Sequence, residues 1–412
     1  MKGKFTPEFF QDNRKRLCEV FGGQAPIILT ANGLIQRTRD DDTYEFHQDS
    51  SFWYLSGIDD PNFILVIDKD KQYLIGPDIN ERWRVFHGDM DLDKFAKISG
   101  ADEVLSYKQG WQKLSKRLKK VKHVATLVPP EDFDERFQVY SNPARRRLVK
   151  QLKSHNSSLQ FIDLTKHIVN LRMVKQAPEI ETIQQTVDET MEVYKLIGKK
   201  LESFKNEREL SAEIDYLFAK KGLNHSFRQI VAGGKNAVTL HYVRNDAPIE
   251  PGKVLLLDIG ASKANYCSDL TRTVSAKPTK RQLAVYDAVM QVREFALKML
   301  RPGVQLASYE SAIRHYMGEK LRELGLIKII DEQSVGKYYP HSTSHFLGID
   351  VHDVGNYQKP LPAGAVLTVE PGIYIPEENI GIRIEDDVLL TETGNRVMSD
   401  RLSRELTSLK IA

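Results

Sequence analysis

Cysteine is almost absent from this sequence, because the 412 residues include only Cys18 and Cys267. So few cysteines exclude a disulfide scaffold, a cysteine-based zinc site and an iron–sulfur cluster. A chain of this kind suits a reducing compartment. We therefore expect a cytoplasmic protein.

Long apolar runs and an excess of one charge are also missing. No stretch of about 18 apolar residues occurs, and the first residues lack the apolar core of a secretion signal, so neither membrane insertion nor export is supported. Lys and Arg total 59 against 56 Asp and Glu, a net charge of +3. This charge supplies no strong field for polyanions, so we expect neither nucleic acid nor a membrane as a partner.

The composition that remains is that of a globular protein with more than one domain. Hydrophobic residues make up 41% and charged residues 28% of a chain too long for one core. In the first part, short apolar runs alternate with charged, helix-like stretches, which predicts an α/β domain. These runs are residues 26–31, 62–68, 72–76 and 123–129.

The sequence pattern changes near residue 165. A helical stretch of some twenty-five residues follows Pro178, which suits the first turn of a helix. Asn206 then has the form of an N-cap, with Glu209 as its reciprocal acid, and Gly222 ends the next helix. We expect one domain over residues 1–165 and a second over residues 166–412.

The second domain places two aspartates inside a strand-like stretch, residues 254–276. Asp258 ends a continuous apolar run, and Asp269 opens an alternating one after a turn-rich middle. Opposed residues of an antiparallel hairpin have a constant number sum. A turn at residues 263–264 would therefore place Asp258 opposite Asp269.

Two glutamates are arranged in the same way in residues 365–390. A turn at residues 377–378 would place Glu370 opposite Glu385, and strand alternation turns Ile382 and Ile384 to the other face. Like charges directly opposite destabilise a sheet, so both acidic pairs need compensating cations. A pair of divalent metal ions would supply them.

Three histidines, His341, His345 and His352, lie between the two acidic stretches. Ser342 stands where an HExxH metalloprotease motif needs Glu, which excludes that motif. A single histidine is more often structural. Three of them beside four carboxylates in apolar strands and Arg383 are hard to explain as solvated surface.

These stretches resemble the motif set of the pita-bread metallopeptidases, in particular the Xaa-Pro aminopeptidases (aminopeptidase P) and the prolidases. The segments that carry the resemblance are LLLDIGA, YCSDLTRT, HSTSHFLGIDVHD, TVEPGIY and IGIRIEDD. AGGKNAVTLHY (232–242) resembles the family segment that ends in a substrate-facing His. HQDSSFWYLSGIDDP (47–61) resembles a signature of the aminopeptidase P N-terminal domain. The implied fold is a smaller N-terminal α/β domain followed by a C-terminal pita-bread α+β domain with pseudo-two-fold symmetry.

The resemblance also implies a dinuclear metal site. One metal would be bound by Asp269, His345, Glu370 and Glu385, and the other by Asp258, Asp269 and Glu385. Oxygen-rich ligation with one imidazole suits Mn²⁺, with Co²⁺, Zn²⁺ and iron as alternatives. A hydroxide held between the metals would attack the scissile carbonyl.

Further roles follow from the resemblance. His241 and His352 would stabilise the oxyanion and orient the substrate, and Glu370 would transfer the proton to the leaving nitrogen. His341 would line the substrate pocket. Arg383 and Tyr374 would hold a ligand carboxylate, that of Asp258.

The implied activity is cleavage between an N-terminal residue and a following proline in peptide substrates, by a homo-oligomer (a dimer or tetramer). Prolidase, which cleaves Xaa-Pro dipeptides, is the alternative. Prolidases characteristically carry an Arg in the loop before VEPGIY, whereas residues 353–364 here contain Lys359 and no Arg. Ser344 before His345, where prolidases more often have Gly, also favours the aminopeptidase. A metal-free binding protein of the same fold is a third reading, against which the five intact ligand positions argue.

Overall fold

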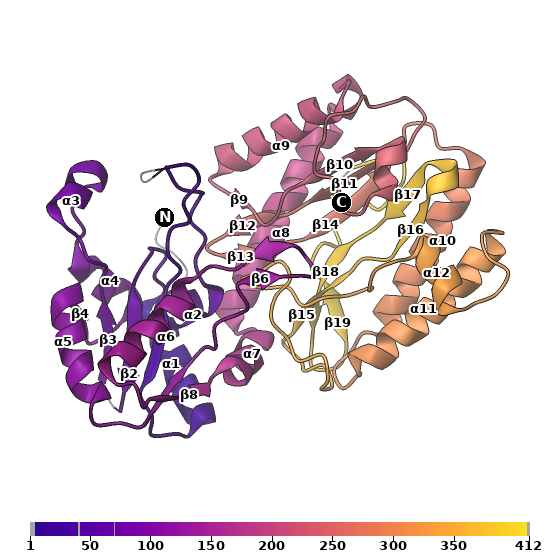
Figure 1. Cartoon of the computed structure of the whole chain (residues 1–412). Coiled ribbons are helices and arrows are strands. Elements are labelled where there is room, and N and C mark those ends of the chain that lie inside the picture. The colour runs from indigo at the N-terminus through magenta and orange to yellow at the C-terminus, as the bar shows by residue number, and fades with distance from the viewer. Residues whose placement is uncertain (1–4, 40–41, 70, 410–412) are drawn as a thin grey trace. The chain divides into compact units, whose positions relative to one another are not determined.

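The computed structural model describes residues 5–39, 42–69 and 71–409. The chain divides into two compact units, the first ending at Leu171 and the second beginning at Arg172. Helix α7 (Thr165–Met173) contains this change of unit (Figure 1). The domain boundary expected between residues 165 and 166 stays a prediction.

The first unit is built on a six-stranded sheet with the strand order β4-β3-β2-β1-β5-β8. Its helices are α1 (Pro7–Phe21), α2 (Ser50–Ser56), α3 (Glu81–His87), α4 (Leu92–Ser99), α5 (Tyr107–Leu118) and α6 (Ala144–His155). Its strands are β1 (Ile27–Thr30), β2 (Ile64–Asp68), β3 (Lys71–Ile75), β4 (Glu103–Leu105), β5 (His123–Thr126) and β8 (Gln160–Asp163), with β6 (Phe133–Asp134) and β7 (Val139–Tyr140) paired separately.

Strand β2 runs antiparallel to β1 and β3, and the other neighbouring pairs of this sheet are parallel. The four apolar runs of the sequence become β1, β2, β3 and β5, which confirms the α/β prediction. One face of the sheet, represented by Ile28 and Val66, packs against Leu114 and Leu118 of α5 and Leu152 of α6. Both faces are apolar, as expected for a sheet covered on both sides.

The second unit repeats one pattern, two long helices followed by a β-hairpin. Its helices are α8 (Ala177–Gly198), α9 (Glu207–Lys221), α10 (Lys280–Met299), α11 (Leu306–Glu323) and α12 (Glu332–Tyr338), with short 3₁₀ turns η1 (Leu201–Ser203), η2 (Gly234–Val238) and η3 (Pro376–Glu378). Its strands are β9 (Asn224–His225), β10 (Ile230–Gly233), β11 (Leu255–Ile259), β12 (Ala261–Lys263), β13 (Tyr266–Cys267), β14 (Leu270–Val274), β15 (Val366–Val369), β16 (Gly372–Ile375), β17 (Ile380–Arg383), β18 (Asp386–Leu390) and β19 (Asn395–Val397). The repeat agrees with the expected pita-bread architecture.

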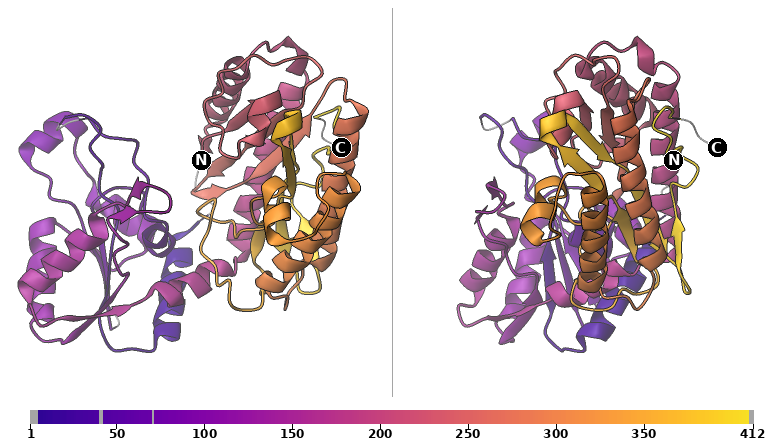
Figure 2. Two further views of the ribbon diagram at one scale, coloured as in Figure 1. Left: turned by 45° about the vertical axis from the view of Figure 1, so that its right-hand side comes forward. Right: turned by 90° about the vertical axis from the view of Figure 1, so that its right-hand side faces the viewer.

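The strands of the second unit lie between the two helix pairs, α8 with α9 and α10 with α11 (Figures 1 and 2). The hairpins meet along β14, where the Glu385 N–H donates to the Thr271 carbonyl at 3.0 Å.

The predicted helix caps are also present. The Asn206 side chain accepts from the Glu209 N–H, and Gly222 ends α9 with φ 67°. Among the described residues, no helix is long and apolar enough to cross a bilayer.

The register of the first hairpin differs from the sequence prediction. Asp258 lies opposite Thr271, not Asp269, because the turn is formed one residue later than expected, by Ala264 and Asn265. Both turn residues have positive φ, 47° and 65°, as a two-residue hairpin turn requires. The shift moves the partner by two residues, so it preserves the face of the sheet. Asp258 and Asp269 therefore still share one face.

The register of the second hairpin is the predicted one. Val369 pairs with Asp386 in one ladder and Gly372 with Arg383 in the next, and the same register places Glu370 opposite Glu385 between them. The turn falls at η3, over the expected position. Ile382 and Ile384 are fully buried in the hydrophobic core, on the face away from the acids, as strand alternation predicts.

Candidate metal centre

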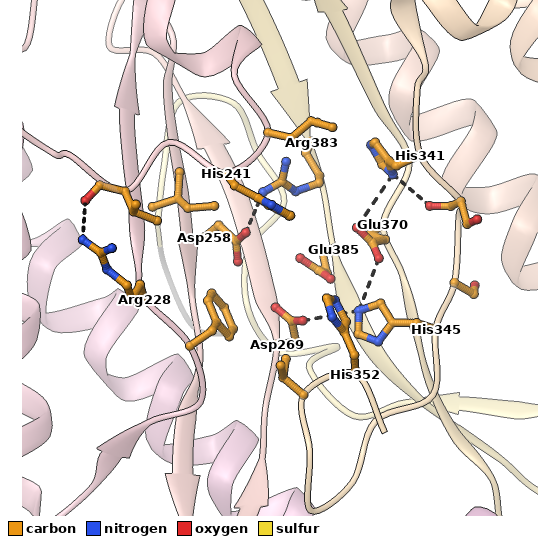
Figure 3. Close-up of a pocket in the computed structure, with 17 residues that line it drawn as sticks. Arg228, His241, Asp258, Asp269, His341, His345, His352, Glu370, Arg383 and Glu385 are labelled. Carbon is orange, nitrogen blue, oxygen red and sulfur yellow. Dashed lines mark hydrogen bonds and ion pairs between the residues drawn. The ribbon is translucent and has the colours of Figure 1, made fainter. Parts of the chain in front are cut away.

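The predicted site residues converge on one cavity of about 580 Å³ in the second unit (Figure 3). The acids come from the hairpins. Asp258 lies near the end of β11, Asp269 directly before β14, Glu370 directly after β15, and Glu385 between β17 and β18. The predicted residues that line the cavity are His241, Asp258, Asp269, His341, His345, His352, Glu370, Arg383 and Glu385. Tyr374 lies behind this lining, in contact with His341 and Arg383.

Three of the expected ligands are close enough to share one ion. Asp269, His345 and Glu385 offer ligand atoms that lie within 4.8 Å of one another. His345 Nε2 is 3.5 Å from Asp269 Oδ2 and 3.4 Å from Glu370 Oε1. Asp258 joins the same cavity from β11, as Figure 3 shows.

The His345 ring is oriented for ligation by its backbone. Nδ1 lies 3.1 Å from the Phe346 carbonyl oxygen, to which it donates a proton, so Nε2 faces the acids. Burial alone would lower the pKa of His345, but the carboxylates of Asp269 and Glu370 outweigh it and raise the pKa to about 9. This ring therefore lies in a strongly negative field.

The acids of the cavity repel one another. Burial raises the pKa of Asp258 to about 6, against the influence of Arg383, and raises that of Glu370 to about 7. Burial and the neighbouring acids also hold the pKa of Glu385 well above its ordinary value. A divalent cation pair would offset this repulsion and favour the ionised forms of Asp258, Glu370 and Glu385.

The donors fit such a pair of ions. Asp258 Oδ1 is buried and has no hydrogen-bond partner among the described residues, while Oδ2 accepts from Arg383 Nη2 at 2.5 Å. An orphaned buried carboxylate oxygen is costly unless a cation occupies its free direction. Carboxylates with one imidazole form a ligand set for hard or borderline divalent metals.

A chain of polar contacts leads from Asp258 to the outer wall of the cavity. Arg383 Nη1 donates to Tyr374 Oη at 2.9 Å, and Tyr374 Oη lies 2.9 Å from His341 Nε2. His341 Nδ1 lies 2.8 Å from the Ser342 carbonyl oxygen, so the neutral ring donates there and accepts from Tyr374. Burial and the Arg383 charge lower the pKa of His341 to about 3, which keeps the ring neutral.

Two threonines, which sequence reasoning missed, hold ligand carboxylates. Thr271 Oγ1 donates to Glu385 Oε2 at 2.6 Å, and Thr368 Oγ1 donates to Glu370 Oε1 at 3.3 Å. The signal was present, because strand alternation places Thr368 on the face of Glu370 and Thr271 on the face of Asp269.

Other missed residues support the loops, and no local pattern identifies them. Glu310 on α11 accepts the backbone N–H groups of Thr343 and Ser344, at 2.8 and 3.0 Å, and so holds the backbone between His341 and His345. Asp387 accepts the Asp269 N–H at 3.0 Å. Arg228 is exposed at the cavity, where its guanidinium makes a 3.4 Å contact with the Val243 carbonyl (Figure 3).

His352 lies beside His345, with ring centroids 4.4 Å apart and planes at 89°. The next residue, Asp353, is fixed by a buried ion cluster. Lys175 Nζ lies 2.9 Å from Asp353 Oδ2, and the Arg172 guanidinium bonds the other oxygen. The backbone that carries His352 is therefore anchored independently of any metal.

Comparisons with known proteins agree with this geometry. Residues 181–392 match metallopeptidase family M24, and residues 10–126 match the aminopeptidase P N-terminal domain. The Xaa-Pro aminopeptidase of Haemophilus influenzae is 30% identical over 99% of this chain and 97% of its own length. The Xaa-Pro aminopeptidase of Escherichia coli is 29% identical over 98% and 97%.

Solved structures agree over the whole chain. Aminopeptidase P from E. coli, determined with the inhibitor Pro-Leu, superposes with a TM-score of 0.86 at 27% identity, covering 98% of this chain and 97% of that one. Proline aminopeptidase P II from Yersinia pestis gives a TM-score of 0.84 at 26% identity, covering 97% and 98%.

Proposed function

Because the chain belongs to metallopeptidase family M24 and carries the aminopeptidase P N-terminal domain, we propose that it is an Xaa-Pro aminopeptidase. It is a metal-dependent hydrolase that removes an N-terminal residue from peptides with proline at the second position. The observation that carries this proposal is the cavity in which four carboxylates and His345 converge, in a chain that matches Xaa-Pro aminopeptidases over nearly its full length.

Asp258, Asp269, His345, Glu370 and Glu385 would hold two divalent ions, with Mn²⁺ as the first choice and Co²⁺ or Zn²⁺ as alternatives. When bound, the two ions supply an activated water and polarise the scissile carbonyl. Arg383 and Thr271 orient the Asp258 and Glu385 carboxylates for this task through the hydrogen bonds described above.

The chain's own side chains would handle the protons and the substrate. Glu370, at the cavity, would accept a proton from the activated water and pass it to the leaving proline nitrogen. His352 and His241, both at the cavity, would stabilise the oxyanion and orient the peptide. His341, kept neutral, would line the pocket with Tyr374 behind it.

Proline explains the specificity of such a site. An Xaa-Pro bond is a tertiary amide without an N–H, so a pocket shaped around the ring selects it over ordinary peptide bonds. The free N-terminal amine of the substrate is cationic, and the acidic cluster offers it a place beside the metals. The cut therefore falls after the first residue.

Removing the His352 ring tests its proposed role. His352→Ala should keep normal metal content and lose about 2.7–4 kcal/mol of transition-state stabilisation in kcat/KM, the cost of removing one oxyanion donor elsewhere. Metal analysis together with steady-state kinetics on an Xaa-Pro peptide measures both. His315→Ala, at an exposed position on α11, serves as the control. Loss of metal from His352→Ala would instead make His352 a ligand.

Peptide length separates the aminopeptidase from prolidase. Lys359, the one cation of the 353–364 loop, is exposed and does not line the cavity, and Arg383 is committed to Asp258 and Tyr374. We expect an Xaa-Pro-Yaa-Zaa peptide to be hydrolysed with a higher kcat/KM than the Xaa-Pro dipeptide, and Lys359→Ala to leave the ratio unchanged. A dipeptide cleaved at least as efficiently as its extension, with or without Lys359, would establish prolidase instead.

We further propose a cytoplasmic homo-oligomer, a dimer or tetramer. The free thiols of Cys18 and Cys267 support a reducing compartment. Association is supported by apolar side chains exposed on the first unit, where Val85 is 77%, Phe86 65% and Tyr140 84% accessible. Sedimentation equilibrium at micromolar concentration tests this, and a monomer there would contradict it.

A further inference from the structure

The position of His241 depends on its backbone. Its ring lines the cavity but forms no hydrogen bond or ion pair with the described residues. Leu240 and Val243 line the same cavity. Whatever orders residues 233–247, here called the His241 segment, therefore orders this part of the substrate site.

Glu207 ties this segment together from outside the cavity. It is the first residue of α9 and is 0% exposed. Its Oε1 accepts from the Gly233 N–H at 2.8 Å and from Asn236 Nδ2 at 2.9 Å. Its Oε2 accepts from Tyr242 Oη at 2.8 Å and from the Ala247 N–H at 2.9 Å. One carboxylate thus joins both ends of the His241 segment and the neighbour of His241.

The hydrogen-bond partners of this carboxylate are unusual for a buried acid. Within the described chain Glu207 forms no ion pair with a Lys or Arg, so four neutral donors stabilise it, together with the N-terminal end of α9. A buried carboxylate is costly unless all its lone pairs are used. A Gln side chain cannot reproduce this arrangement, because its amide oxygen can accept at only one of the two positions and its nitrogen cannot accept at the other.

The His241 segment is also pressed against the strand that carries Arg383. A Cβ atom at Gly381 on β17 would lie 2.0 Å from the Ala237 carbonyl oxygen, so only glycine permits this approach. The segment therefore contacts the metal-site strand on one side and Glu207 at its ends. Beyond His241, Asn245 also bonds the backbone of Val231 and Gln229, at 2.9 and 3.0 Å, whereas Glu207 holds Tyr242 together with both ends of the segment.

We infer that Glu207 is a positioning residue that fixes His241 against the substrate by binding the His241 segment at Gly233, Tyr242 and Ala247. The inference rests on the proposed function only for the role of His241. The anchoring itself can be measured without activity.

Kinetics of a double-mutant cycle test the coupling. Glu207→Gln should lower kcat/KM for an Xaa-Pro peptide by at least about tenfold with unchanged metal content. In the His241→Ala background the same change should cost less than about twofold, because the residue it positions is gone. Glu209→Gln is the matched control. Glu209 lies in the same helix turn and accepts the Lys205 N–H at 2.7 Å, but it does not bond the His241 segment. The Glu209→Gln substitution should therefore leave kcat/KM unchanged. An equal loss in both backgrounds would overturn the inference.

Amide hydrogen exchange measures the anchor directly. The Gly233 and Ala247 amides should exchange at least about tenfold faster in Glu207→Gln than in the unaltered protein. Should that variant not fold, Tyr242→Phe, which removes one of the four donors, should fold and still accelerate exchange at Ala247. Unchanged exchange would overturn the anchor. If the unaltered protein fails to cleave Xaa-Pro peptides, the proposed function is wrong, and exchange alone then decides whether Glu207 holds the segment.

Discussion

Replacing Asp269 by Asn should remove bound metal and peptidase activity together, with the fold retained. Asp269 is 6% exposed, lies within ligand distance of His345 and Glu385, and is the expected bridge between both metals. Asn keeps the shape but loses the charge. Substituting a residue that only orients a metal ligand lowers metal affinity or activity by about 10–100-fold. Substituting the ligand Asp269 itself should therefore lower kcat/KM by at least about 100-fold.

The measurement combines metal analysis, circular dichroism and kinetics after chelation and return of Mn²⁺. Glu385→Gln should behave alike, because its carboxylate occupies the corresponding place on the second hairpin. Asp287→Asn, at an exposed position on α10, is the matched control and should keep full activity. Full activity of Asp269→Asn after metal return would refute the ligand assignment.

Replacing Asp353 by Ala should destabilise the protein by about 3–5 kcal/mol, the cost of breaking a buried ion pair from one side. The side chains of Arg172, Lys175 and Asp353 are 3%, 1% and 1% exposed. Removing Asp353 takes the buried carboxylate away from both Lys175 and Arg172, while the 2.8 Å pair between Arg172 and Asp350 stays. Both cations are buried, so the loss of this carboxylate leaves charge that is poorly compensated in the interior.

Denaturant unfolding at a fixed metal concentration measures this loss. Asp350→Ala is the matched control, because the Asp350 side chain is 35% exposed and such a pair contributes about 1 kcal/mol or less. Burial would raise the pKa of Asp353, but Arg172 and Lys175 outweigh it and lower the pKa. The stabilisation is therefore complete above the unfolded pKa of about 4 and declines as the pH falls below it. An Asp353→Ala variant no less stable than Asp350→Ala would contradict the buried-cluster account.

The strand registers show how far sequence reasoning extends. The turn of the second hairpin was located correctly, because Pro376 and Asn379 mark a turn there. The first turn is formed by Ala264 and Asn265, both with positive φ. Neither is glycine, so the sequence does not mark the turn, and the predicted position is one residue too early. Side-chain alternation tolerated the error, because a displacement by two keeps the face. The shared face of Asp258 and Asp269 was thus predictable although their pairing was not.

The candidate ligands were visible in the sequence because ionisable groups rarely occupy buried strands. Their roles stay a prediction. The supporting contacts could not be predicted, since they join segments far apart in the chain. Glu207 meets Tyr242, Glu310 meets Thr343, and Lys175 meets Asp353 only once the helices pack. A local pattern shows which side chains share a face but not which distant loop an acid on a helix will reach.

The division of the acids between two hairpins has a consequence for biosynthesis. During translation, Asp258 and Asp269 are synthesised well before His345, Glu370 and Glu385, because helices α10 and α11 lie between the two groups in the chain. Domains generally fold as units during translation, starting from the N-terminal one. The nascent second unit must therefore carry two aspartates on an incomplete sheet, and the centre can close only after β18 has emerged. With the proposed ligands, metal capture would therefore follow synthesis of the second hairpin.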